Sequence, residues 1–244
     1  MEASYTKLKS FFACEYSYYL RYIKRVPLKE SSASLYGSAI HKTVAIATVG
    51  SLPKDDWAKV FKQQWMIETN KSKIDFSGES DFYKKYTRGQ TMVTDYYDAF
   101  VVGKKPPVMV EYFFGRDNPV RIGNHTLVGI FDQIDEEGNV IDLKTEVKTT
   151  QARIDCDLQF TLYAYAYRHL FNKEENSLVL RHLGTMKDVV TYRTKDDFKF
   201  LEEEIDNVEK RSKGNTFVRS LDRNCATCYF LGTCLGKEVK QWYN

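Results

Sequence analysis

Two carboxylates and a lysine form the sharpest chemical pattern in this sequence. Asp132 lies in GIFDQID, Asp142 follows in IDLKT, and Lys144 comes two residues after Asp142. If residues 125–135 and 139–145 form a hairpin, the two carboxylates can lie near one another across it. Such a pair makes a hard oxygen site that suits Mg²⁺ or Mn²⁺. A lysine on the same side of the strand can orient water or screen negative charge that develops on a phosphate.

Further polar positions accompany this pattern. Glu111 stands inside the apolar segment VMVEYFF, where a carboxylate is costly to bury unless it is paired or binds a metal. Gln159 and Tyr163 are spaced to share one face of a helix. His41 follows Gly37 as G-x-x-x-H among small residues. An Asp-x-Lys pair is common on surface strands, and a lone histidine on such a helix is more often a core residue. All four elements in this order are much less expected by chance.

The cysteines form a second candidate site. Cys225, Cys228 and Cys234 are spaced C-x2-C-x5-C, and thiolates this close together usually hold a metal ion or a cluster. Such sites usually take four protein ligands, so one ligand is missing from this set. Cys14 and Cys156 are the two candidates for the fourth position. With Cys14, the site would join the two ends of the chain.

Composition is typical of a soluble globular protein. The chain has 244 residues, 43% hydrophobic and 28% charged, which is enough for one large domain or two small ones. Five cysteines argue against a secreted disulfide scaffold, the first residues show no apolar signal core, and no apolar run approaches the roughly 20 residues of a membrane span. We therefore expect a cytoplasmic location, or the host cytoplasm for a viral protein. The net charge of +3 is mild, so a nucleic-acid site would need a local basic groove.

Hydrophobic periodicity and turn signals predict the elements that must position these residues. Helices are expected over 6–23 with a break near Cys14, and over 35–49, 55–70, 81–102, 155–171 and 195–213; strands are expected over 108–115, 125–135, 139–145, 177–184 and 189–193. Residues 71–80 read as a loop and residues 136–139 as a hairpin turn. The order favours an α/β fold with a central mixed sheet flanked by helices.

In their order, these motifs resemble the RecB-like nucleases of the PD-(D/E)XK superfamily, particularly the branch with a four-cysteine iron–sulfur cluster. That branch includes the CRISPR-adaptation nucleases and the nuclease domain of AddB. The resemblance spans nearly the whole chain and rests on TKLKSFFACEYSYYLRY at the start, GSAIH at 37–41, Glu111, GIFD at 129–132, DLK at 142–144, QFTLY at 159–163 and the terminal cysteine motif. The chain departs from the pattern at Glu15, where the family commonly has proline. Cys156 matches nothing in the pattern, and we expect it to be a buried free thiol.

The resemblance implies a restriction-endonuclease-like core in a single nuclease domain over residues 1–244. It implies an N-terminal helical part (1–103), an α/β catalytic core (104–213) and a C-terminal iron–sulfur segment (214–244) that forms a cap with Cys14. The four ligands of a [4Fe–4S] cluster would be Cys14, Cys225, Cys228 and Cys234. Zinc is the alternative, but zinc ribbons and fingers normally show two C-x2-C pairs. A role in folding is expected, because the cluster would close a long loop.

The resemblance also implies metal-dependent hydrolysis of DNA phosphodiester bonds. The ligands of Mg²⁺ or Mn²⁺ would be His41, Asp132, Asp142 and the backbone carbonyl of Leu143. Glu111 would support a ligand, a water or a second metal, and Lys144 would position the attacking water. Gln159 and Tyr163 would hold the substrate backbone or a catalytic water.

The expected activity is that of a DNA exonuclease acting on single-stranded DNA or on DNA ends. A structure-specific endonuclease and a non-catalytic nucleic-acid-binding module with the same fold are the alternatives, although the intact His, Asp, Asp and Lys set argues against the module. The sequence has no G-x-x-x-x-G-K-[ST] motif, so any motor must be a separate protein. The expected partners are DNA and a helicase, recombination or CRISPR-adaptation protein.

Overall fold

A mixed sheet forms the centre of the computed structural model, which describes residues 1–28, 30–71, 76, 78–145 and 149–236. Its strands lie in the order β2 (Met109–Phe114), β5 (Gly129–Ile134), β6 (Asn139–Lys144), β7 (Ser177–His182) and β8 (Lys187–Thr191). β6 and β7 run parallel, and the other neighbouring pairs run antiparallel. The mixed sheet and the α/β class are therefore confirmed.

A second, small sheet was not expected from the sequence. It has the order β1 (Glu2–Ala3), β4 (His125–Leu127) and β3 (Val120–Ile122). The expected strand over 125–135 is divided between the two sheets at Val128, whose amide donates to the Ala3 carbonyl at 2.9 Å. Strands of two or three residues are too short to show an alternating pattern, so only pairing across the fold defines them.

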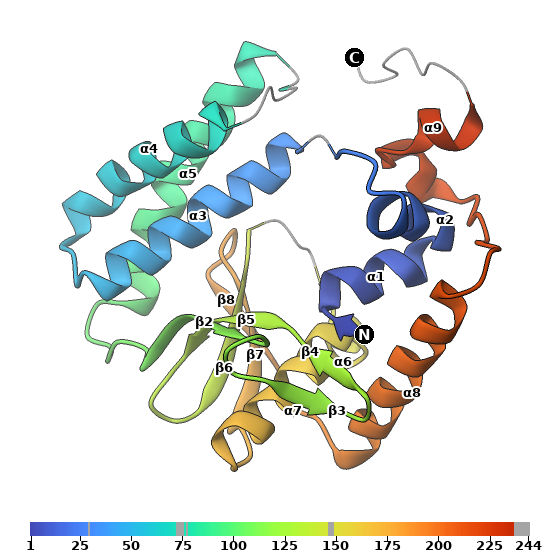
Figure 1. Cartoon of the computed structure of the whole chain (residues 1–244). Coiled ribbons are helices and arrows are strands. Elements are labelled where there is room, and N and C mark those ends of the chain that lie inside the picture. Colours follow the sequence, from blue (N-terminus) through green and yellow to red (C-terminus); the bar gives the residue numbers. More distant parts are fainter. Residues whose placement is uncertain (29, 72–75, 77, 146–148, 237–244) are drawn as a thin grey trace.

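Three long helices cover one face of the central sheet (Figure 1). They are α3 (Ser32–Val49), α4 (Lys54–Asn70) and α5 (Glu79–Phe100), close to the expected bounds. Their buried aromatic side chains pack with apolar residues of β6 and β7, and this core includes Trp57, Phe61, Trp65, Tyr96, Ile141, Leu143 and Val179. This layer places α3 against β2, the edge strand that carries Glu111.

The opposite face is covered by α1 (Tyr5–Ala13), α7 (Leu158–Phe171) and α8 (Lys195–Ser212). The helix expected over 155–171 is present as α7 but begins at Leu158, because a separate short helix, α6 (Gln151–Asp155), ends before Asp157 and the Asp157 side chain caps α7. Arg193 holds this break by donating to the carbonyls of Ile154 at 2.9 Å and Asp157 at 3.0 Å. These contacts join segments far apart in the sequence, so local periodicity could not reveal them.

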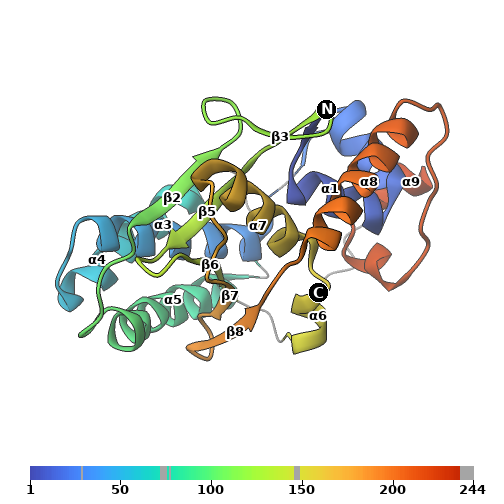
Figure 2. The same cartoon turned by 90° about the horizontal axis from the view of Figure 1, so that it is seen from below.

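The N-terminal helices and the described C-terminal segment up to residue 236 lie on the same side of the molecule. The break expected near Cys14 is confirmed, because its backbone is extended (φ −168°, ψ 113°) between α1 and α2 (Glu15–Tyr18), which continues as the π-helix η1 (Tyr19–Ile23). After α8 come η2 (Arg223–Thr227) and α9 (Leu231–Leu235). Figures 1 and 2 both show α1, α8 and α9 on this side.

Residues 72–75 and 77 of the expected loop over 71–80, and residues 237–244 of the expected iron–sulfur segment, lie outside the described residues. Within the part of the chain that is described, no helix combines the length and hydrophobicity that a membrane span requires.

Candidate active site

Strands β2 and β5 are kinked at Glu111 and Asp132, respectively. These two residues lie level with one another, because the residues on either side of each pair across β2 and β5. Glu111 has a φ of 51°, in the left-handed region that residues other than glycine rarely adopt. Phe131 and Ile134 both pack in the core beneath α7, although residues three apart on a regular strand face opposite ways. The kink leaves both carboxylates facing the helical layer.

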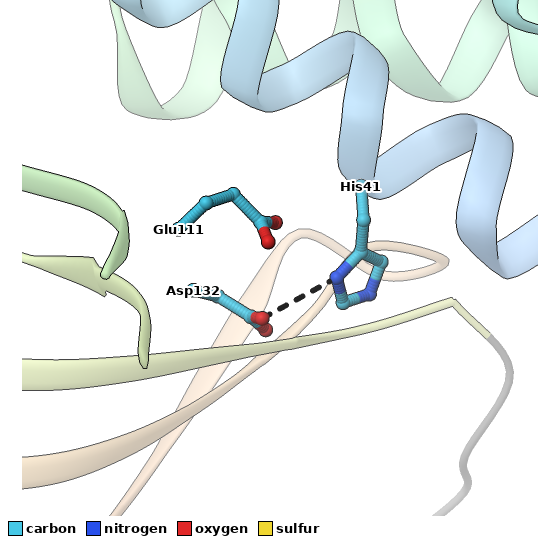
Figure 3. A group of neighbouring side chains, drawn as sticks. All are labelled: His41, Glu111 and Asp132. Atoms are coloured by element: carbon cyan, nitrogen blue, oxygen red, sulfur yellow. Dashed lines mark ion pairs between the residues drawn. The ribbon is translucent and has the colours of Figure 1, made fainter. Parts of the chain in front are cut away.

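His41, Glu111 and Asp132 form a group that could hold a metal ion. One ligand atom of each residue lies within 4.8 Å of the other two. Figure 3 shows the three side chains pointing toward one another from α3, β2 and β5, with His41 Nδ1 3.5 Å from Asp132 Oδ1. One imidazole nitrogen with carboxylate oxygens is a donor set that suits divalent ions such as Mn²⁺ or Mg²⁺.

The hairpin between β5 and β6 opens beside this group. Backbone pairing along the hairpin ends at Gln133 and Ile141. Beyond that point the Leu143 amide donates to Asp132 Oδ2 at 2.7 Å. A buried amide needs an acceptor, so the Asp132 carboxylate replaces a backbone partner where the strands part.

Asp142 is buried next to this opening and is held by two side chains. Gln159 on α7 donates to its Oδ1 at 2.8 Å, and the same amide nitrogen lies 2.9 Å from the Tyr163 hydroxyl. Lys144 Nζ is 2.8 Å from Oδ2 and forms an ion pair with this carboxylate.

The buried charges shift one another's pKa values. Burial raises the pKa of Asp142 to about 6, with Asp132 adding to the rise and Lys144 opposing it. Burial also raises the pKa of Glu111, and the Asp132 charge adds to this. For Asp132 burial acts in the same direction, but His41 and the Leu143 amide outweigh it and hold the pKa below its usual range. Burial opposes protonation of His41, yet the neighbouring Asp132 raises the histidine pKa. The group therefore has a surplus of carboxylates that a divalent cation would relieve.

These side chains open into a cavity of about 510 Å³. The predicted residues brought together there are His41, Glu111, Asp132, Asp142, Lys144, Gln159 and Tyr163. Leu143 does not line the described cavity, and its amide rather than its carbonyl contacts Asp132. The cavity wall also includes Ser4, Tyr5, Ser38 and Lys42, which the motifs did not single out. The only sequence signal for Lys42 is its place directly after His41.

The four cysteines expected to form one site line a second, mostly apolar cavity of about 190 Å³. Cys14 comes from the break after α1, while Cys225, Cys228 and Cys234 come from the segment that includes η2 and α9. Burial raises the pKa of the Cys228 thiol, and the other three thiols add to the rise. Cys156 is exposed and does not line this cavity, so the expectation of a buried thiol was wrong. It lies in the turn between α6 and α7, and the sequence shows no sign of that turn.

Glu15 joins the segment after α1 to α8 and to Val218, beside the cysteine cavity. One of its carboxylate oxygens accepts from Arg211 on α8, and the other accepts from the Val218 amide at 3.2 Å. The next amide, that of Tyr16, donates to the Val218 carbonyl at 3.1 Å. The residue that departs from the family pattern thus anchors the segment leading to the terminal cysteines.

A family model described as the PD-(D/E)XK nuclease superfamily matches residues 2–235. No functionally curated protein matches the chain. Among solved structures, a presumed exonuclease from Eubacterium rectale is similar with a TM-score of 0.57 and 13% identity, over 98% of this chain and 89% of that one. The protein SSO0001 has a TM-score of 0.38 and 14% identity over 96% of both chains, which is too weak to bear on the fold. The family match includes both cavities, and the Eubacterium rectale structure supports the fold alone.

Replacing Glu15 with alanine is expected to destabilise the packing of the segment around Val218 against α2 and α8. The Val218 amide and Arg211 lose their shared acceptor, which should cost about 1–3 kcal/mol. Hydrogen exchange should then speed up in the backbone of residues 214–236 more than in the central sheet, and the urea midpoint should fall. Glu203→Ala, which removes an exposed carboxylate of α8, is the matched control. Equal exchange in the two variants would contradict the role of Glu15.

Proposed function

We propose that this chain, which belongs to the PD-(D/E)XK nuclease superfamily, is a divalent-metal-dependent DNA exonuclease of the RecB-like type. One observation carries the proposal: His41, Glu111, Asp132, Asp142 and Lys144 converge on a single open cavity. Carboxylates, an imidazole and an ammonium at one solvent-accessible place match the needs of phosphodiester hydrolysis.

The residues of the cavity fit Mg²⁺ or Mn²⁺. We assign His41, Asp132 and Asp142 as ligands together with the Leu143 carbonyl, and Glu111 as the residue that supports a ligand, a water or a second ion. The short distances within the His41, Glu111 and Asp132 group support the roles of those three residues, and the place of Asp142 in the cavity wall supports its role. The Leu143 carbonyl is retained from the family resemblance alone. Such an ion supplies an acidified water and a positive charge next to the phosphate.

The remaining side chains prepare the site for that chemistry. Lys144 keeps its ammonium at the cavity wall through Asp142, where it can orient the attacking water and screen negative charge on the phosphate. Gln159 fixes the orientation of Asp142 through the hydrogen bond to Oδ1. We retain Gln159 and Tyr163 as contacts to the substrate backbone or a water, supported by their place in the cavity wall.

The choice of exonuclease rests on the family resemblance, and the name of the Eubacterium rectale protein agrees with it. Single-stranded DNA or DNA ends are the proposed substrate. A structure-specific endonuclease is the second candidate, because the cavity is open to solvent and nothing in its wall demands a chain end. DNA ends would be supplied by a separate helicase, recombination or CRISPR-adaptation protein in the same compartment, the cytoplasm.

We also propose that Cys14, Cys225, Cys228 and Cys234 hold a [4Fe–4S] cluster within one nuclease domain. The four thiols line one mostly apolar cavity of about 190 Å³, and this shared lining supports a common site. Zinc is the alternative occupant of the same four thiols.

Protein purified without oxygen is expected to be brown and to contain about four iron atoms per chain. Cys14→Ser should lose iron, because it removes one of the proposed ligands. Cys156→Ser removes an exposed thiol away from the cavity and should retain the full iron content. Elemental analysis and the visible spectrum measure both. A colourless protein with zinc and no iron would overturn the assignment.

Asp142→Ala and Lys144→Ala are each expected to lower the rate of DNA cleavage about a hundredfold or more. The first removes a metal ligand and the second removes the charge that faces the phosphate. Cleavage of labelled DNA with Mn²⁺ or Mg²⁺ measures the rate, and circular dichroism checks the fold. Asp95→Ala, at an exposed position of α5, should cleave like the wild type. Unchanged cleavage in either site variant would refute the proposed site.

Linear single-stranded DNA is expected to be degraded while a closed circle of the same sequence survives, because an exonuclease needs an end. Substrates labelled at the 5′ or the 3′ end then report the polarity of digestion. Cutting of the circle would favour the endonuclease. Binding of both substrates with no cleavage of either would favour the non-catalytic module.

A further inference from the structure

A buried carboxylate lies on the helical side of the catalytic cavity, outside the metal-binding group. Glu68 on α4 is 4% exposed and contacts three side chains. The ammonium groups of Lys42 and Lys71 each lie 2.6 Å from its Oε1, and the Ser38 hydroxyl donates to its Oε2 at 3.1 Å. Ser38 and Lys42 are one turn apart on α3 and line the cavity, whereas Lys71 is not among the lining residues.

The partners of Glu68 keep it in its charged form. Burial opposes ionisation of Glu68, but hydrogen bonds from Lys42, Lys71 and Ser38 hold its pKa below the usual range. Two ammonium groups therefore face one ionised carboxylate, and Glu30 adds a negative charge that acts on Lys71. The charge of Lys42 also acts on Glu111 in the metal-binding group. It opposes the rise in the Glu111 pKa that burial and Asp132 cause.

The Lys42 ammonium has N–H donors that Glu68 does not use. An ammonium has three N–H donors, and Glu68 takes one of them. The Lys42 side chain is 43% exposed, so solvent or a ligand in the cavity can reach the others. Glu68 would remain paired without Lys42, because Lys71 and Ser38 also contact it. Neutralising Glu68 therefore does not account for the position of Lys42.

We propose that Lys42 binds a backbone phosphate of the DNA strand held in the cavity, and that Glu68 is the positioning residue that holds its ammonium there. The inference rests on the proposed function for the identity of the polyanion. Lys144 faces the cavity from β6, beside Asp142, and is proposed to act on the scissile phosphate. Lys42 faces the same cavity from α3, so it would bind a neighbouring phosphate of the strand. Phosphate contacts fix the strand's position without reading its bases, so the effect should not depend on sequence.

The salt dependence of DNA binding tests this contact without requiring cleavage. Each substitution is placed in the Lys144→Ala chain, and the affinity for a labelled single-stranded oligodeoxynucleotide is measured with Mg²⁺ over a range of salt concentrations. Lys42→Gln is expected to lower the magnitude of the slope of log affinity against log salt by about 0.7, the loss of one phosphate contact on a single strand. Lys42→Arg keeps the charge and should keep the slope.

Lys71→Gln is the matched control. It removes the same charge and another partner of Glu68, but not a group that lines the cavity. Its slope should equal that of the Lys144→Ala chain. Glu68→Gln should weaken binding only where Lys42 is present, because a positioning residue acts through the residue it positions. In the otherwise wild-type enzyme, Lys42→Gln should raise KM with little change in kcat.

An unchanged slope in Lys42→Gln would overturn the inference, and so would equal losses in Lys42→Gln and Lys71→Gln. The second result would mean that only the overall charge of the cluster matters. Because binding is measured in an inactive chain, the result does not depend on nuclease activity. A wild-type protein that binds DNA through Lys42 but does not cleave it would refute the proposed function and leave this contact standing.

Discussion

The hydrogen bond from the Leu143 amide to the Asp132 carboxylate decides how β5 and β6 separate beside the candidate metal-binding group. Buried amides must be paired, so β5 and β6 can part only where another acceptor replaces the strand backbone. Asp132 is that acceptor, and its other oxygen faces His41 on α3. Asp142 meets Gln159 on α7, from the opposite helical layer. The site thus lies where side chains from both helical layers meet the carboxylates of β5 and β6.

Charge compensation is the second constraint on this edge. Glu111, Asp132 and Asp142 are three carboxylates in a partly buried volume, where like charges repel strongly and solvent screens them little. His41 and Lys144 offset part of this charge, and a divalent ion would offset more. The left-handed backbone of Glu111 fits the same picture, because strained conformations persist at functional sites where the surrounding structure holds them.

The cysteine cavity and the acidic cavity offer different chemistry but share a helix. Thiolates are soft ligands and carboxylates are hard ones, so the two sites would select different metals. The α1 helix spans the distance between them: residues at its N-terminal end line the acidic cavity, and it ends at Cys14 in the cysteine cavity. Glu15 then joins this helix to α8 and to the segment around Val218. The α1 helix therefore contributes residues to the walls of both cavities.

The sequence by itself determined the long helices, the main strands and the residues that gather at the acidic site, because helical and strand periodicities and short motifs are local properties. Only the tertiary structure decided the short strands β1 and β3, the break before α7 that exposes Cys156, and the Glu68 contacts that hold Lys42 at the cavity. It also decided that Glu15 would contact Arg211 and the Val218 amide. Each of these depends on hydrogen bonds or ion pairs between elements distant in sequence, which form only once both hydrophobic cores have brought those elements together.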